Sequence, residues 1–265
     1  MNMFFHELKS YRKSTIIWSF SIVAIVVLFL SMYPSFSNDI ESVNDLLKSY
    51  PAEIRKAFGI TLNSFSSILG FYSYSFIYIS ICGCIQAMNL GLSVVSKETS
   101  DKTADFLLTK PVTRKEILTA KLLATLTCII ITNVIFILAA IIIANVVSNT
   151  SFDTKLFLMI SITMFFMQLI FLSLGIIIST TITKIKSVIS ISLSTVFGFY
   201  IIGMIQSVID NDLLKYVTPF KFYDPSTIIK NASYQTSSII LEIVFIFICI
   251  LISYYIYSTK DIHSV

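Results

Sequence analysis

Residues 122–147, LLATLTCIIITNVIFILAAIIIANVV, form an apolar run without a single charged side chain. A helix needs about 20 predominantly apolar residues to cross a bilayer, so this run predicts a membrane-spanning helix. The composition of the whole chain agrees, because 55% of its 265 residues are hydrophobic and only 13% are charged. Since soluble domains carry about 25% charged residues, most of this chain is expected to lie in lipid.

Five further segments are long and apolar enough to cross a membrane. Together with the run above, the predicted spans are residues 15–33, 68–95, 122–147, 156–182, 187–209 and 239–257. The second, third and fourth exceed the thickness of a bilayer, so they are expected to tilt or to project into water. The sequence therefore predicts an all-α integral membrane protein with six transmembrane helices in one domain over residues 1–265.

The distribution of Lys and Arg predicts which side of the membrane each loop faces, because cytosolic loops are enriched in both. With the N-terminus inside, twelve of the 19 basic residues fall in cytosolic segments, and the other seven are spread over longer outer loops. The clearest signal is the turn at residues 183–186, which holds Lys184 and Lys186. Both termini are predicted to lie in the cytosol, a topology written N-in/C-in.

The residues ahead of the first span have an amphipathic pattern. Phe4, Phe5, Leu8 and Tyr11 recur at helical spacing, with charged residues between them. This pattern is typical of a helix that lies in the membrane interface. The sequence leaves open whether this helix couples cytosolic motion to the first span or only anchors the chain.

The first long outer loop, residues 34–64, is expected to hold two short helices. Asp39 is a predicted N-cap of the first helix. Pro51 suits the first position of the second, and Gly59 suits the position just after its end.

The other long outer loop, residues 210–238, is rich in aromatic residues. Asp224 and Pro225 predict the start of a short helix that ends near Lys230. The sequence does not decide whether this loop lies on the outer surface or dips back into the bilayer.

The loop between the second and third spans, residues 96–121, is predicted to contain a short cytosolic helix. Glu98 and Lys102 form a favourable i,i+4 pair. The apolar edge of this helix consists of Ala104, Leu107 and Leu108. Such a helix could transmit displacement from a cytosolic partner to two spans, or it could be a solvated connector.

The end of this loop carries clear stop and start signals. Pro111 ends the short helix, because the residue before a proline is pushed out of the α region. Thr113 and Glu116 match a capping box, which is expected to start the helix of the third span.

This loop resembles the cytosolic loop in membrane permeases of type-2 ATP-binding-cassette (ABC) exporters, and bacterial peptide and antibiotic exporters in particular. The similar residues are Lys97-Glu98, Lys102-Thr103, Phe106-Leu107-Leu108, Pro111-Val112-Thr113-Arg114 and Lys121. The six-span layout, the amphipathic N-terminus and the long loop before the last span extend the resemblance over nearly the whole chain. In that family the equivalent loop forms a coupling helix that contacts a separate ATPase. The resemblance gives this ATPase-coupling role to Lys97, Glu98, Asp101, Lys102, Phe106, Leu107 and Leu108.

The resemblance also implies partners, a location and a class of cargo. It implies a single permease domain that pairs with a second permease copy, as a homodimer or a heterodimer, and with two copies of a cytosolic ABC ATPase subunit. The implied location is a bacterial plasma membrane, in contact with membrane lipid. Antimicrobial or toxin peptides are the favoured cargo, with lipids or drugs as alternatives, so the implied role includes peptide export and multidrug or antimicrobial peptide resistance.

The sequence lacks features of several other functions. No G-x-x-x-x-G-K-[ST] phosphate loop occurs, so the chain is not expected to hydrolyse ATP, and ATP and Mg are expected on the partner ATPase. No catalytic residues, metal site, cofactor or nucleic-acid partner is predicted for this chain. The four cysteines, which fall inside apolar runs and are interpreted as small apolar packing residues, are Cys82, Cys84, Cys128 and Cys249.

Polar residues within the spans are candidates for a substrate path. An aromatic wall in the outer half of the second span and several neutral amides could line it: Tyr74, Tyr78, Gln86, Asn89, Asn133 and Gln168. The amides could equally hold helices together through interhelical hydrogen bonds. Ser190, Ser194 and Gly198 form a small-residue stripe, which is assigned to helix packing, with a seam between two copies of the chain as one location for it.

Three rival functions are weighed against the exporter. An intramembrane enzyme is a poor fit, because no Asp falls within a span and both His lie at the chain ends. An ion-coupled secondary transporter or channel would use buried charges, and Glu242, which could instead reach the interface or pair with a nearby Lys, is the single candidate in the predicted spans. A membrane anchor or regulator of an ATPase, without transport, is the third.

Overall fold

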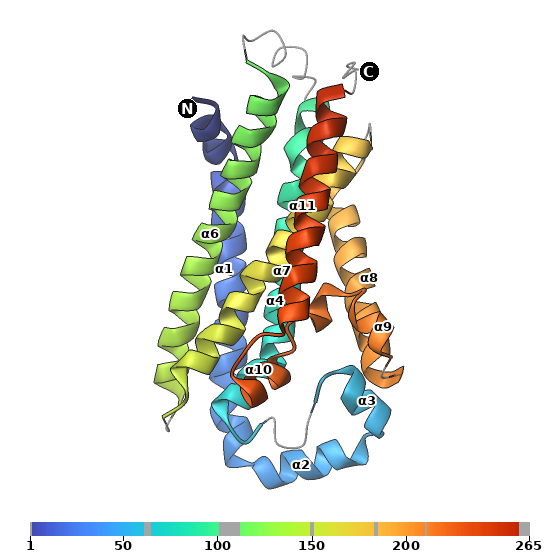
Figure 1. The fold of residues 1–265 in the computed structure, drawn as a ribbon. Coiled ribbons are helices and arrows are strands. Elements are labelled where there is room, and N and C mark those ends of the chain that lie inside the picture. Colours follow the sequence, from blue (N-terminus) through green and yellow to red (C-terminus); the bar gives the residue numbers. More distant parts are fainter. Residues whose placement is uncertain are drawn as a thin grey trace.

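A computed structural model describes residues 2–60, 65–100, 112–148, 151–182, 185–209 and 211–259 of the chain (Figure 1). All regular elements in these ranges are helices. In chain order they are α1 (Asn2–Asn38), α2 (Ile40–Ser49), α3 (Ala52–Ala57), α4 (Ile68–Ser100), α6 (Arg114–Val147), α7 (Thr154–Thr181), α8 (Val188–Ile209), α9 (Asp212–Lys215), the 3-10 helix η1 (Pro219–Lys221), α10 (Pro225–Asn231) and α11 (Thr236–Thr259).

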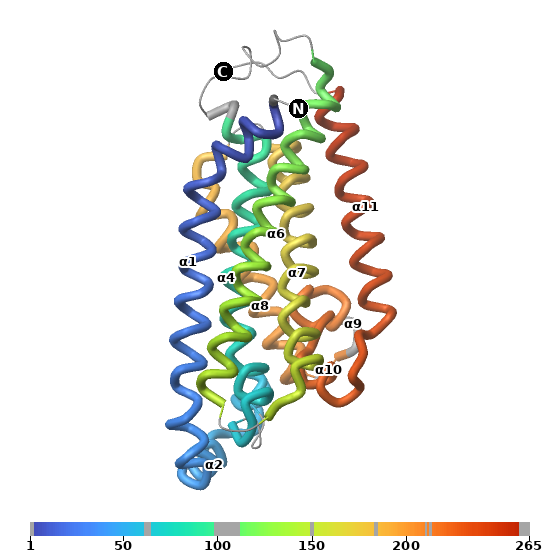
Figure 2. Tube along the Cα trace, turned by 90° about the vertical axis from the view of Figure 1, so that its left-hand side faces the viewer, coloured from blue at the N-terminus to red at the C-terminus, as the bar shows by residue number. Residues whose placement is uncertain are grey.

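Six helices in the described ranges are long and apolar enough to cross a membrane, namely α1, α4, α6, α7, α8 and α11. Each contains one of the six predicted spans to within one or two residues, which confirms the number and order of these spans. The six helices run along a common axis (Figures 1 and 2). The start of α1 and the end of α11 lie at one end of the bundle, here called the terminal end, whereas α2, α3 and α10 lie at the opposite end, the far end (Figure 1).

Helix α1 is longer than predicted, because it is one continuous helix of 37 residues that includes the amphipathic N-terminal segment. Its first turns lie at an angle to the remainder (Figure 2). The helix also continues through Pro34, where an outer loop was predicted to begin. Proline removes one backbone donor, but membrane helices tolerate this loss where neighbouring groups satisfy the freed carbonyl.

The predicted capping box at the start of α6 is confirmed. The Thr113 side chain accepts a hydrogen bond from the Glu116 backbone N–H at 3.3 Å, and the Thr113 N–H donates to the Glu116 carboxylate at 2.8 Å. This cap satisfies two backbone donors at once, so α6 begins at Arg114, well before the apolar run.

For the short helices at the far end, the predicted end of α3 is confirmed, whereas the predicted starts of α2 and α3 are confirmed only in part. Gly59, at a φ of +65°, follows α3, and the N–H of Ile60 bonds to the carbonyl of Arg55 at 2.9 Å, as in a Schellman motif. Asp39 is the N-cap residue of α2, as predicted, but its side chain makes no capping hydrogen bond. Pro51 precedes α3 as its N-cap residue and does not occupy its first position.

The predicted helix after Asp224 is confirmed as α10, with Pro225 at its first position. Helix α10 packs against α7 and α4 at the far end. The chain between α8 and α11 therefore folds back against the bundle.

The centre of the bundle is the pair α4 and α7, which are its most buried spans. Two glycines allow their backbones to meet. A Cβ on Gly91 would lie 2.4 Å from the carbonyl oxygen of Leu172, and one on Gly175 would lie 2.7 Å from that of Met88. Helices α1 and α6 pack along each other beside this pair, and α8 and α11 contact its other sides (Figure 1).

Candidate functional site

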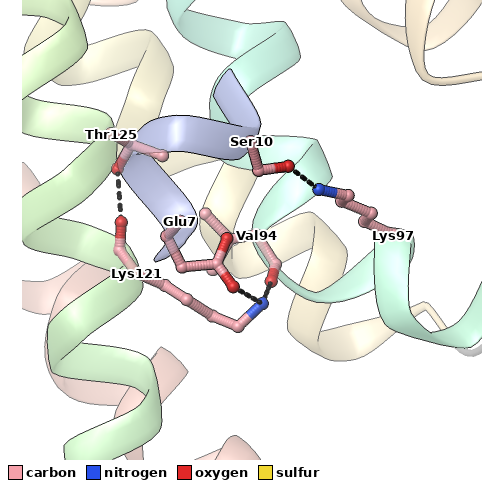
Figure 3. A network of polar contacts seen from close by, with 6 residues as sticks. All are labelled: Glu7, Ser10, Val94, Lys97, Lys121 and Thr125. Carbon is pink, nitrogen blue, oxygen red and sulfur yellow. Dashed lines mark hydrogen bonds and ion pairs between the residues drawn. The ribbon is translucent and has the colours of Figure 1, made fainter. Parts of the chain in front are cut away.

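A buried charge lies at the terminal end, where α4 ends and α6 begins (Figure 3). The Lys121 side chain of α6 is fully buried, and its Nζ donates a hydrogen bond to the backbone carbonyl of Val94 in α4 at 2.7 Å. The same Nζ lies 3.7 Å from a carboxylate oxygen of Glu7 in α1, which is itself 7% exposed. One ammonium group therefore joins three helices.

A second contact links the same part of α1 to α4. The Lys97 ammonium group donates to the Ser10 hydroxyl (Figure 3) and lies 5.4 Å from the centre of the Tyr11 ring. A cation at this distance from an aromatic ring is attracted by the ring quadrupole. Residues 7–11 of α1 thus hold both helices that flank residues 101–111. We call the set Glu7, Ser10, Val94, Lys97 and Lys121 the terminal junction.

Most of the predicted ATPase-coupling residues cannot be placed in this geometry. Lys97 lies near the end of α4, which runs on to Ser100, so residues 97–100 continue the second span. The side chain of Glu98 lies outside the described part of the structure. So do Asp101, Lys102, Phe106, Leu107 and Leu108.

Three of the predicted path amides lie together at the centre of the bundle. Gln86 donates to the Thr132 hydroxyl at 2.8 Å, Asn133 donates to the Gln168 carbonyl at 2.5 Å, and Gln168 donates to the Gly83 carbonyl at 3.1 Å. Gln86 and Gln168 are fully buried. These bonds connect α4, α6 and α7, which supports the interhelical reading of these amides. Asn89 is half-buried on α4, near Ser93.

The two predicted path tyrosines lie nearer to the start of α4, toward the far end of the bundle. The hydroxyls of Tyr74 and Tyr78 are 3.2 Å apart, and the ring of Tyr78 stacks on that of Phe29 at 5.3 Å. Tyr74 also lines a cavity of about 660 Å³ in the far half of the bundle.

This far-end cavity lies between α3, α4, α8, η1 and α10. Its polar lining includes Lys56, Ser73, Tyr74, Gln206, Lys221 and Asp224. Its apolar lining includes Phe58, Leu69, Ile77, Met204, Phe220 and Ile229. Ligand sites are commonly 300–1,000 Å³ and combine an apolar wall with a few polar groups, so the cavity can accept an amphipathic molecule.

Glu242 of α11 is buried, with 4% of its surface exposed, and accepts a hydrogen bond from the Tyr223 hydroxyl. A Lys of the preceding loop was one partner considered from the sequence, whereas the structure gives Glu242 the Tyr223 hydroxyl. Burial, and then the bond to Glu242, raises the pKa of Tyr223 well above its ordinary value, so this hydroxyl remains a donor. Tyr223 also lines the far-end cavity, which places Glu242 directly behind the cavity wall.

Sequence reasoning missed the terminal junction. Lys121 was counted as a loop residue because it precedes the apolar run by one position. Its neighbours in the sequence gave no sign of a partner in α1. The capping box was the usable signal, since a helix that starts at Arg114 carries Lys121 into its second turn.

Comparison with protein families gives a match over most of the chain. The family model described as ABC-2 family transporter protein matches residues 1–262. No curated protein sequence matches the chain.

Proposed function

Because the chain belongs to the ABC-2 transporter family, we propose that it is the transmembrane subunit of an ATP-driven exporter and forms the path for an amphipathic substrate. A separate ABC ATPase supplies the energy, and a second permease copy completes the transporter. Peptides such as antimicrobial or toxin peptides are the favoured cargo, and a bacterial plasma membrane is the favoured location. The topology is N-in/C-in, so the terminal end faces the ATPase.

The far-end cavity is the observation that carries the transport role. It combines charged, hydroxyl and aromatic side chains with an apolar wall, and amphipathic cargo needs both kinds of contact. Tyr74, which the sequence analysis named as a candidate residue of the substrate path, lines this cavity. In the N-in orientation the cavity lies in the outer half of the membrane, where exported cargo would leave.

The terminal junction supports coupling to a cytosolic ATPase. The end of α4 and the start of α6, which residues 101–111 connect, are both bonded to α1 at the terminal junction. A force applied to these residues would therefore reach three spans.

The outward faces of the spans support a second permease copy. Ser190 and Ser194 of α8 are exposed, and a Cβ on Gly198 would meet no atom of the chain within 4 Å. This stripe of small residues does not pack within the chain, so it is open to another helix.

An ion-coupled secondary transporter is the second candidate, and buried Glu242 is the observation that favours it, because ionisable groups inside spans commonly mark ion pathways.

Reconstitution separates the two candidates. The chain is purified from membranes of its own host together with any bound protein that contains a phosphate loop, placed in liposomes, and assayed for export of labelled peptides, lipids and drugs. We expect export that requires ATP and the bound ATPase. Export that persists without the ATPase and stops when the ion gradient is collapsed would support the secondary transporter instead.

A further inference from the structure

The Glu7–Lys121 ion pair is an unusual choice for a buried position. The Nζ to carboxylate distance is 3.7 Å, longer than a hydrogen bond, and the second carboxylate oxygen of Glu7 has no hydrogen-bond partner among the described residues. Removing both charges from water costs free energy that such a pair only partly recovers. Apolar side chains at both positions would hold the helices together at least as well. The pair is therefore poorly explained as a device for stability.

The position of the pair suggests a different purpose. Glu7 contacts Lys121 near the start of α6, and Ser10 contacts Lys97 near the end of α4 (Figure 3). Both contacts come from a single turn of α1. Buried polar pairs are best attested where they fix the register of packed helices or favour one of two arrangements.

We propose, on the basis of the proposed function, that Lys121 is a positioning residue for ATP-driven transport and that Glu7 and Lys121 form a releasable latch between α1, α4 and α6. When closed, the latch holds the last turns of α4 and the first turns of α6 at a fixed separation. Displacement of these residues by an ATPase is passed to α6 through Lys121 and to α4 through Val94 and Lys97. Without the ammonium group the helices still pack, but displacement of the loop is no longer shared between them.

The latch has a well-matched control in the same chain. Asp45 and Lys48 form an ion pair at 3.0 Å on α2, with exposed side chains, far from the terminal junction. The test variant is Glu7→Leu with Lys121→Met, which removes both charges and leaves none buried alone. The control variant is Asp45→Leu with Lys48→Met, and Lys121→Arg keeps a charged donor at the junction.

The first measurement uses the full-length chain in lipid nanodiscs and needs no ATPase. Hydrogen exchange of backbone amides in residues 3–14 is followed by mass spectrometry. In the Glu7→Leu/Lys121→Met variant we expect exchange about tenfold faster, because local opening of this segment is no longer opposed by the latch. The control pair should leave this segment unchanged, and Lys121→Arg should restore slow exchange.

The second measurement uses the complex with its bound ATPase in liposomes, and records cargo exported per ATP hydrolysed. We expect this ratio to fall about fivefold or more in the latch variant, while ATPase binding stays as in the unaltered complex. A loss of stability alone would lower both transport and ATP hydrolysis and leave their ratio unchanged. The latch proposal is overturned if the Glu7→Leu/Lys121→Met variant shows wild-type hydrogen exchange in residues 3–14 and exports the wild-type amount of cargo per ATP hydrolysed.

Two further outcomes are distinguishable. If the unaltered chain binds no ATPase and exports nothing with ATP, the proposed function fails, while the exchange measurement still decides whether the latch holds α1. If the double variant does not fold, Glu7→Gln serves in its place, because it removes the ion pair with a side chain of similar size and leaves the hydrogen bond from Lys121 to Val94. It should speed exchange of residues 3–14 by a smaller factor, and an unchanged rate would count against the latch.

Discussion

At the residue scale, polar side chains of the bundle fall into two groups that composition does not distinguish. Gln86, Asn133 and Gln168 bond to one another, to Thr132 and to the backbone at the buried centre, whereas Tyr74 lies in the wall of a cavity. The Asn133 Oδ1 has no hydrogen-bond partner among the described residues, but it is buried away from the cavity lining. The first group is expected to govern stability, and the second to govern transport.

Replacement of Gln168 by Leu should therefore lower stability without changing cargo preference. The change leaves the Gly83 carbonyl and the Asn133 amide without their partner. Interhelical hydrogen bonds of this kind contribute about 1 kcal/mol in membrane proteins. Unfolding of the purified chain in mixed micelles by a denaturing detergent measures the loss, and Ser93→Ala, which removes a bond within one helix, is the control. Altered cargo preference at unchanged stability would assign Gln168 to the path.

Replacement of Tyr74 by Ala should change the response of the ATPase to cargo. The ring and hydroxyl lie at the cavity, so their removal widens it and deletes a polar contact. We expect the cargo concentration for half-maximal stimulation of ATP hydrolysis to rise several-fold, with basal hydrolysis unchanged. Tyr255→Ala on the exposed face of α11 is the control. Identical stimulation curves for both variants would remove Tyr74 from the path.

At the scale of elements, the packing of α4 on α7 depends on backbone contact at two glycines. Gly91 lies against the backbone of Leu172, which cannot move aside as a flexible side chain could. Close approach of this kind increases dispersion contacts between helices, which membrane proteins need because lipid supplies no hydrophobic driving force between spans.

Two alanine substitutions test this close approach with the same added methyl group. Gly91→Ala places a Cβ 2.4 Å from a carbonyl oxygen, so the helices must separate, and we expect destabilisation of about 1–3 kcal/mol. Gly198→Ala meets nothing within 4 Å and should be neutral, or stabilising by up to about 1 kcal/mol from helix propensity. Detergent-induced unfolding measures both. Equal effects would show that the α4–α7 contact is looser than described.

The elements also show what sequence reasoning can and cannot reach. The six spans and the start of α6 were predictable, because apolar length and a capping box are local signals. It was not predictable that the amphipathic N-terminal segment and the first span form one continuous helix. Whether a helix continues past charged residues depends on which groups pack against them. The position of Asp39 at the N-cap of α2 was predictable, but the absence of its capping hydrogen bond was not, because α1 ends at the residue just before it and leaves its backbone outside the usual capping conformation.

The candidate sites were less predictable than the helices. A cavity arises where elements distant in sequence, such as α3 and η1, meet around α4 and α8, and no local pattern encodes that meeting. The partner of Lys121 comes from more than a hundred positions earlier in the chain. Pairs of this kind become visible only when the helices are placed in space.

At the scale of the whole molecule, the outward faces of α6, α8 and α11 are apolar and exposed, and lipid or a second chain must cover them. The stripe on α8 that contains Ser194 favours a second chain at that face. A Ser194→Cys variant should form a covalent dimer under mild oxidation in native membranes, since two symmetric stripes would place the thiols together. Val146→Cys, at an exposed position of α6, should remain monomeric. Dimers of the Val146→Cys variant alone would move the contact to α6.

Helix α1 runs without interruption from the terminal junction to α2 at the far end (Figure 1). A straight helix of 37 residues would be about 55 Å long, and the part of α1 beyond its angled first turns is a stiff rod that makes up most of this length (Figure 2). Pivoting this rod by about 5° around its midpoint would move its two tips in opposite directions by about 2 Å each. Movements on the two sides of the membrane could then be coupled by the rotation of a single rigid segment, without any signal having to pass from residue to residue through the core.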